Sequence, residues 1–114
     1  MFELMEKLFP ICRSITGNGV RETLKILSGY ISLETHEVKT GTKVFDWNVP
    51  MEWNIKDAYI KSNKGEKIID FKNSNLHVLG YSIPINESVK LDELKKHMYT
   101  IPEQPDIIPY KTSY

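Results

Sequence analysis

The first thirty residues carry apolar side chains at helical spacing. Phe2, Met5, Leu8 and Phe9 recur three or four positions apart with charged residues between them. This pattern predicts an amphipathic helix between the first and the last of them. Pro10 ends or kinks that helix, because proline lacks the backbone N–H and clashes with the preceding turn.

A second apolar stripe follows a glycine-rich loop. Val20, Leu24 and Leu27 lie at helical spacing, and Gly29 supplies a stop, so a second helix is predicted through Ser28.

The loop Thr16-Gly17-Asn18-Gly19 offers Asn18 as the N-cap of this second helix. Backbone N–H groups before a helix can cradle an anion, but the loop lacks the lysine of a P-loop and follows a helix instead of a strand. A structural turn is the favoured interpretation.

Beyond residue 30 the spacing of apolar residues changes to the period of two that is typical of strands. Strands are predicted over 33–39, 44–49, 55–61, 66–71 and 76–83. Ser62-Asn63-Lys64-Gly65 has turn chemistry, so the third and fourth strands should form a hairpin.

A short helix should follow, with Leu91, Leu94 and Met98 on one stripe, before a tail that holds three of the six prolines. The predicted fold class is α+β. Two N-terminal helices occupy 1–30, and a mostly-β region with one short helix occupies 31–114.

Net charge and cysteine content exclude several classes of function. The 114 residues include 15 basic and 15 acidic side chains, so no surplus exists to attract nucleic acid or anionic lipid. The single Cys12 excludes a disulfide framework and a thiolate zinc cluster. The longest stretch without charge, 73–86, is too short for a membrane span, and Glu3 and Glu6 interrupt any secretory leader. We therefore expect a cytoplasmic protein that uses neither nucleic acid nor a membrane as a partner.

Few side chains suggest catalysis or metal binding. His36, His77 and His97 lie far apart, and none belongs to a ligand pair such as H-x-x-x-H, so surface or structural roles are favoured over zinc ligation. Cys12 is flanked by Ile11 and Arg13 and is expected to act as a small buried hydrophobe, with a nucleophilic role as the weaker alternative.

Aromatic and acidic side chains are most concentrated in the nine residues 45–53. Phe45, Asp46, Trp47, Glu52 and Trp53 form a candidate binding surface that could stack on a sugar or a peptide. A strand whose Phe45 and Trp47 fill a core, while Trp53 covers an edge, is favoured over binding. Paired carboxylates also serve glycoside hydrolysis, which is the least favoured of the three interpretations.

Three stretches carry a resemblance to a known family. They are 8–24 (Leu-Phe-Pro-Ile-Cys-Arg-Ser-Ile-Thr-Gly-Asn-Gly-Val-Arg-Glu-Thr-Leu), 45–53 (Phe-Asp-Trp-Asn-Val-Pro-Met-Glu-Trp) and the proline-bearing tail. The chain resembles, over essentially all its length, the N-terminal portion of bacterial zinc aminopeptidase-like proteins. These belong to the zinc exopeptidase superfamily, are catalogued as a domain of unknown function and are associated with polysaccharide biosynthesis.

The resemblance implies that the two opening helices belong to a zinc-exopeptidase-like α/β domain. It also implies that 31–114 is an inserted, incomplete β domain. The family's metal ligands lie in later His-Pro and Asn-Asn-Glu-Leu-Ser-Gly segments that this sequence does not contain. No catalytic or metal residue is therefore carried over, and zinc is implied only for the complete protein.

The expected function is that of an N-terminal fragment of a metal-dependent aminopeptidase-like hydrolase, a peptidase or amidase in its complete form. The resemblance leaves open whether this chain alone is an enzyme. Its expected partner is the rest of the polypeptide, and exposed helix faces favour a homo-oligomer or aggregation. The alternative is a binding or self-association module that uses the surface around Trp47 and Trp53.

Overall fold

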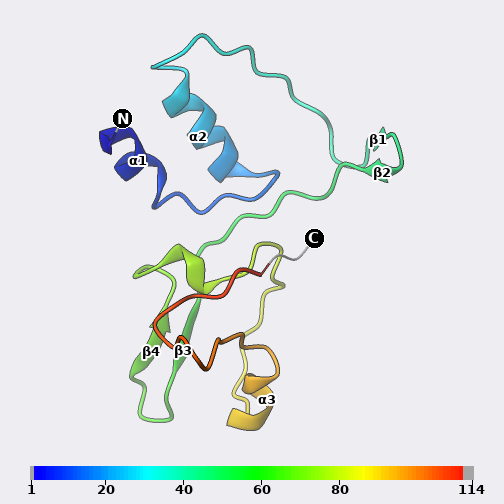
Figure 1. Ribbon diagram of the computed structural model, residues 1–114. Coiled ribbons are helices and arrows are strands. Elements are labelled where there is room, and N and C mark those ends of the chain that lie inside the picture. Colours follow the sequence, from blue (N-terminus) through cyan, green and yellow to red (C-terminus); the bar gives the residue numbers. More distant parts are fainter. Residues whose placement is uncertain (1, 112–114) are drawn as a thin grey trace.

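A computed structural model describes residues 2–111 of the chain (Figure 1). Helix α1 (Phe2–Leu8) and helix α2 (Asn18–Leu27) lie at one end of the molecule. Both predicted N-terminal helices are confirmed. The expected cap is wrong, because Gly17 occupies the N-cap position and Asn18 is already helical.

The strands form two separate antiparallel hairpins. Strand β1 (Lys43–Val44) pairs with β2 (Trp47–Asn48), and β3 (Tyr59–Lys61) pairs with β4 (Lys67–Asp70) across a register irregularity at Ile60/Lys61. The β3–β4 hairpin and its Ser62–Gly65 turn are confirmed. Gly65, at φ 84°, supplies the left-handed residue of that turn, and its N–H donates to the Ser62 carbonyl at 2.9 Å.

Three predicted strands are wrong. The stretch 44–49 is itself a hairpin, because Phe45 and Asp46 form a two-residue turn between β1 and β2. Residues 33–39 are irregular chain that joins no sheet. In place of the strand over 76–83 stands the single 3-10 turn Asn75–His77, followed by irregular chain in which Tyr81 has a φ of 63°.

The short helix α3 (Leu91–Lys95) forms within the predicted region but ends before Met98. The tail then folds back over the β3–β4 hairpin as a series of turns (Figure 1). At the level of fold class, α+β is confirmed as three helices with two small sheets. No helix within residues 2–111 is long and apolar enough to cross a membrane.

The chain is an open framework. Of the described residues only Gly17 and Thr23 are buried, and no apolar side chain among them is. The radius of gyration is 17.1 Å, whereas a compact domain of this length has one of about 13 Å. The exposed surface of 10159 Å² exceeds by about 3,700 Å² that expected for a folded protein of this mass.

Candidate functional site

Most of the described side-chain hydrogen bonds between distant residues lie where the start of α2 meets two later segments. We call this region, residues 16–21, 51–54 and 79–82, the junction. The Thr16 hydroxyl lies 2.9 Å from the Tyr81 hydroxyl and donates to the Met51 carbonyl at 3.2 Å. The Trp53 indole N–H donates to the Ser82 carbonyl at 2.9 Å.

Two glycines allow the backbones in the junction to approach closely. A Cβ on Gly17 would lie 2.5 Å from the Trp53 carbonyl oxygen, and its φ of 126° also favours glycine. A Cβ on Gly19 would lie 2.2 Å from the Cys12 carbonyl oxygen. The glycine-rich loop is therefore a packing element, as the structural-turn interpretation predicts.

The N-terminus of α2 is capped by a residue from outside the helix. The backbone N–H of Asn18 donates to the Asn54 side-chain oxygen at 2.7 Å, which satisfies one of the donors that a helix leaves free at its start. One backbone donor at this helix end is thus engaged by the chain itself.

An ion pair fastens α2 to the segment before Asn54. The Arg21 guanidinium donates two hydrogen bonds to the Glu52 carboxylate, one of 2.9 Å between Nη1 and Oε2. The hydrogen bond from Arg21 lowers the pKa of Glu52, and the same hydrogen bond raises the pKa of Arg21. Both side chains remain half exposed, so the pair contributes to orientation more than to stability.

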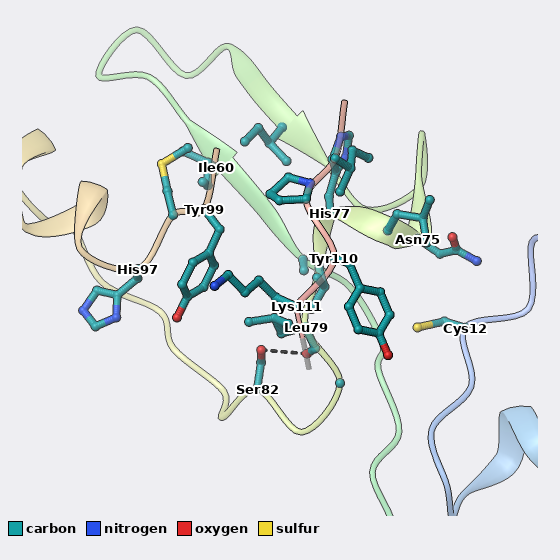
Figure 2. Close-up of a pocket in the computed structure, with 18 of the residues that line it drawn as sticks. Cys12, Ile60, Asn75, His77, Leu79, Ser82, His97, Tyr99, Tyr110 and Lys111 are labelled. Carbon is teal, nitrogen blue, oxygen red and sulfur yellow. Dashed lines mark hydrogen bonds between the residues drawn. The ribbon is translucent and has the colours of Figure 1, made fainter. Parts of the chain in front are cut away.

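A cavity of about 980 Å³ lies beside the junction (Figure 2). Its walls come from the segment after α1, from β3, from the 75–82 segment and from the tail, including Cys12, Ile60, Leu79, Tyr99 and Tyr110. These walls are mainly apolar and aromatic, which suits an apolar or aromatic occupant.

The titratable groups at this cavity do not form a reactive centre. Burial raises the pKa of the Cys12 thiol, with Arg13 acting weakly in the opposite direction, so the neutral thiol is favoured and a nucleophilic role is disfavoured. His77 and His97 line the cavity and are exposed. Figure 2 shows them on different sides of it.

No group of three or more His, Cys, Asp or Glu side chains that could hold a metal ion exists within residues 2–111. The described residues therefore do not fit a zinc site, and no catalytic step through a metal can be derived from this chain.

The structure divides the predicted binding surface into two parts. Phe45, Asp46 and Trp47 lie on the β1–β2 hairpin, whereas Glu52 and Trp53 belong to the junction. Trp53 is half-buried and packs against Tyr81, with ring centroids 6.4 Å apart. The expectation that Phe45 and Trp47 fill a core is wrong, because 92% of Phe45 and 49% of Trp47 are exposed.

Sequence reasoning missed the partners that build the junction, namely Arg21, Asn54, Tyr81 and Ser82. Their contacts join residues at least 29 positions apart, and no local pattern signals such pairs. The one available signal was the glycine at both positions flanking Asn18.

Comparison with known proteins places the chain in a family. Residues 52–114 match a family described as "Domain of unknown function (DUF2172)". The chain belongs to this family. The matched region contains β3, β4, α3 and most of the cavity wall, together with Glu52 and Trp53 of the junction.

This DUF2172 chain is 63% identical over all 114 residues to a Clostridium acetobutylicum protein described as a "Putative polysaccharide biosynthesis protein with aminopeptidase-like domain". It is also similar to the crystal structure of a "putative peptidase" from Clostridium acetobutylicum, with a TM-score of 0.94 and 64% identity over 99% of the chain. The chain spans about a quarter of each relative, 26% and 27% respectively. The predicted resemblance to aminopeptidase-like proteins is confirmed.

Proposed function

We propose that this chain forms the amino-terminal part of a longer, metal-dependent aminopeptidase-like hydrolase that cleaves peptide or amide bonds. The observation that carries the proposal is the TM-score of 0.94 at 64% identity with a chain described as a "putative peptidase". Both relatives are about four times as long as this chain, which leaves ample polypeptide for a catalytic centre.

In this proposal, α1 and α2 belong to a zinc-exopeptidase-like α/β domain, and 31–114 is inserted into that domain. The apolar face of α1 supports this assignment, because Phe2, Met5 and Phe9 are each more than half exposed. Such a face is stable in water only when another surface covers it. The excess exposed area of about 3,700 Å² is large enough for an extensive interface with the rest of a polypeptide.

The metal, zinc by the resemblance, would be held outside this chain. When bound, such an ion activates water and polarises the scissile carbonyl. The part played by the present residues is architectural: the junction fixes α2 against the cavity-bearing region and so sets how the inserted region stands beside the hydrolase domain.

The proposal can be tested with three proteins. They are the 114-residue chain, the full-length Clostridium acetobutylicum relative, and a chimera in which this chain replaces the matching quarter of that relative. Release of product from chromogenic aminoacyl amides is measured with added Zn²⁺, and zinc content is measured on each purified protein. The relative and the chimera should release product and should lose this activity when a chelator is added. The 114-residue chain alone should release no product.

Two results would contradict the proposal. The first is stoichiometric zinc and amide cleavage by the 114-residue chain alone, which would show that the site lies within it. The second is a metal-loaded relative that is folded and yet inert across aminoacyl, peptide and simple amide substrates.

A binding module is the second candidate, and the position of Trp53 favours it. Trp53 lines the cavity together with Tyr99 and Tyr110, an arrangement of aromatic faces suited to a sugar ring or a peptide side chain. Tryptophan fluorescence titration against glycans and peptides tests it. A saturable shift that Trp53→Phe abolishes and Trp47→Phe preserves would support binding in the cavity, and a flat response would end this candidate.

A further inference from the structure

The apolar cavity beside the junction has walls that are themselves uncovered (Figure 2). Every residue that lines it is exposed or half-buried, and Tyr110 in the tail is 90% exposed. A site for a small molecule buries most of its ligand between side chains that the protein already holds in place. The walls of this cavity need cover of their own, and a small molecule is too small to cover segments from so many parts of the chain.

The β3–β4 hairpin contributes an apolar pair to the cavity. Ile60 and Ile69 lie opposite each other in the register of the two strands, and both line the cavity and are half-buried. Within residues 2–111 this sheet has two strands. A two-stranded sheet is marginally stable in water unless a further strand or a packing partner supports it. The occupant of the cavity should therefore carry apolar side chains that pack on this hairpin.

The lengths of the relatives indicate where such an occupant comes from. This chain spans 26% and 27% of them, so about three quarters of each lies outside the matched region. In the proposed function, on which this inference rests, the chain is the amino-terminal part and the polypeptide continues beyond residue 114. Lys111 lines the cavity three positions before that residue, so the continuation begins close to a cavity wall.

This connection favours the same polypeptide over a second copy of the chain. A segment joined to the cavity by a short stretch of chain is present at an effective concentration of about a millimolar. A separate copy reaches such a concentration only when the protein itself does.

We propose that the polypeptide following residue 114 in the longer protein fills this cavity with apolar side chains, which pack on the β3–β4 hairpin and on the tail. The cavity is then an interface within one polypeptide. A sugar or peptide site in the same cavity is incompatible with this arrangement.

The single cysteine tests the interface without any substitution. Cys12 lines the cavity and is half-buried. Its alkylation by N-ethylmaleimide, quantified on its peptide by mass spectrometry, is compared between the 114-residue chain and the chimera with the Clostridium acetobutylicum relative. Alkylation should be about 10-fold slower or more in the chimera, as for a thiol that reacts only after local opening. Far-UV circular dichroism checks that the chimera is folded.

Two substitutions provide a second probe and its control. Tyr110→Cys places a thiol on the exposed tail wall, and this thiol should also react about 10-fold more slowly or less in the chimera than in the chain. Lys64→Cys places a thiol in the exposed, charged turn of the β3–β4 hairpin, outside the cavity, and should react at the same rate in both proteins.

Hydrogen exchange of the tail amides, residues 99–111, supplies a readout that needs no thiol. Few of these amides take part in backbone hydrogen bonds that the structure describes, those of Gln104 and Ile107 among them. We therefore expect rapid exchange in the 114-residue chain and protection in the chimera.

Two results would overturn the interface. Equal alkylation of Cys12 in the chain and in a folded chimera would show that the cavity stays open in the longer protein. Protection of Cys12 in the chain alone that grows with protein concentration would assign the cavity to a second copy. The proposed function is tested separately: a chimera that protects Cys12 and cleaves no amide would contradict the hydrolase and support the interface, whereas an active chimera with unprotected Cys12 would overturn the interface alone.

Discussion

The junction and the β1–β2 hairpin with its flanks, residues 40–50, which we call the arm, are neighbours in the sequence and are built on different principles. The junction joins residues 29 to 65 positions apart, as in the pairs Trp53–Ser82 and Thr16–Tyr81. The arm joins residues within 10 positions, as in the bond from Thr40 to the Pro50 carbonyl. Residues 2–111 are therefore organised by a few side-chain and backbone contacts and not by a buried core, and of these two regions the junction is the one that connects distant parts of the chain.

Their glycines show the same difference. Gly19 is required because the Cys12 carbonyl lies where a Cβ would stand, whereas Gly41 in the arm has a φ of 83° and no atom within 4 Å of its Cβ position. Gly19 is required by a neighbouring backbone, whereas Gly41 is favoured only by its own backbone conformation.

The largest expected effect is that of Gly19→Ala. The collision with backbone atoms should lower the free energy of unfolding by about 3 kcal/mol, at the upper end of overpacking costs. Gly41→Ala should cost about 1 kcal/mol through strain alone. Urea unfolding followed by tryptophan fluorescence measures both. Gly80→Ala is the control, because its Cβ meets open space and its φ is not positive. If Gly19→Ala and Gly41→Ala lowered the free energy of unfolding equally, the proposed difference between the junction and the arm would be wrong.

A smaller effect separates the two tryptophans. Trp53→Phe removes the indole N–H that donates to the Ser82 carbonyl, and should cost about 1 to 2 kcal/mol including lost packing on Tyr81. Trp47→Phe, on the half-exposed side chain in the arm, should stay within about 0.5 kcal/mol of wild type. Urea unfolding of both variants measures the difference. A larger loss of unfolding free energy in Trp47→Phe than in Trp53→Phe would mean that the arm packs against the rest of the chain.

The smallest effect concerns acid sensitivity at the junction. Because Arg21 lowers the folded-state pKa of Glu52, this carboxylate adds stability that is present above its unfolded pKa and is lost as pH falls through the folded one. Glu52→Gln should therefore flatten the loss of stability between neutral pH and about pH 3. Part of that loss should remain, because the hydrogen bond from Lys67 lowers the pKa of Asp70 in the same direction.

Arg21→Gln provides the matched test of that prediction. Removing the guanidinium should flatten the same acid limb, and the double variant should add nothing further, since both changes break one pair. Additive effects of the two substitutions, measured by urea midpoints from pH 3 to pH 7, would contradict the assignment.

The elements that could be predicted from sequence are those with local causes. Apolar spacing specified α1, α2 and the start of α3, and turn chemistry with Gly65 specified the β3–β4 hairpin. The period of two over 44–49 was ambiguous, because a strand and a tight hairpin share it and Phe45 stands where a glycine would have marked the turn. The stretch 33–39 has strand propensity, but a strand also requires a neighbour that takes its hydrogen bonds.

The candidate site was less predictable for the same reason. The aromatic content of 45–53 directed attention to that stretch, of which Trp53 lines the cavity, and its role as a binding surface stays a prediction. The pairing of Glu52 with Arg21, and of Asn54 with the start of α2, depends on how distant segments meet. The cavity itself has walls from many segments of the chain, and no single segment signals it.

The cap on α2 has a consequence for how the chain is made. Asn54 follows Asn18 by 36 residues, so at ribosomal elongation rates the start of the helix is synthesised about 2 to 7 s before its cap. During that interval the Asn18 N–H must be satisfied by water. This donor of the first turn is therefore bonded within the chain only after the junction has been translated, and a pause in translation between the two positions would prolong the interval.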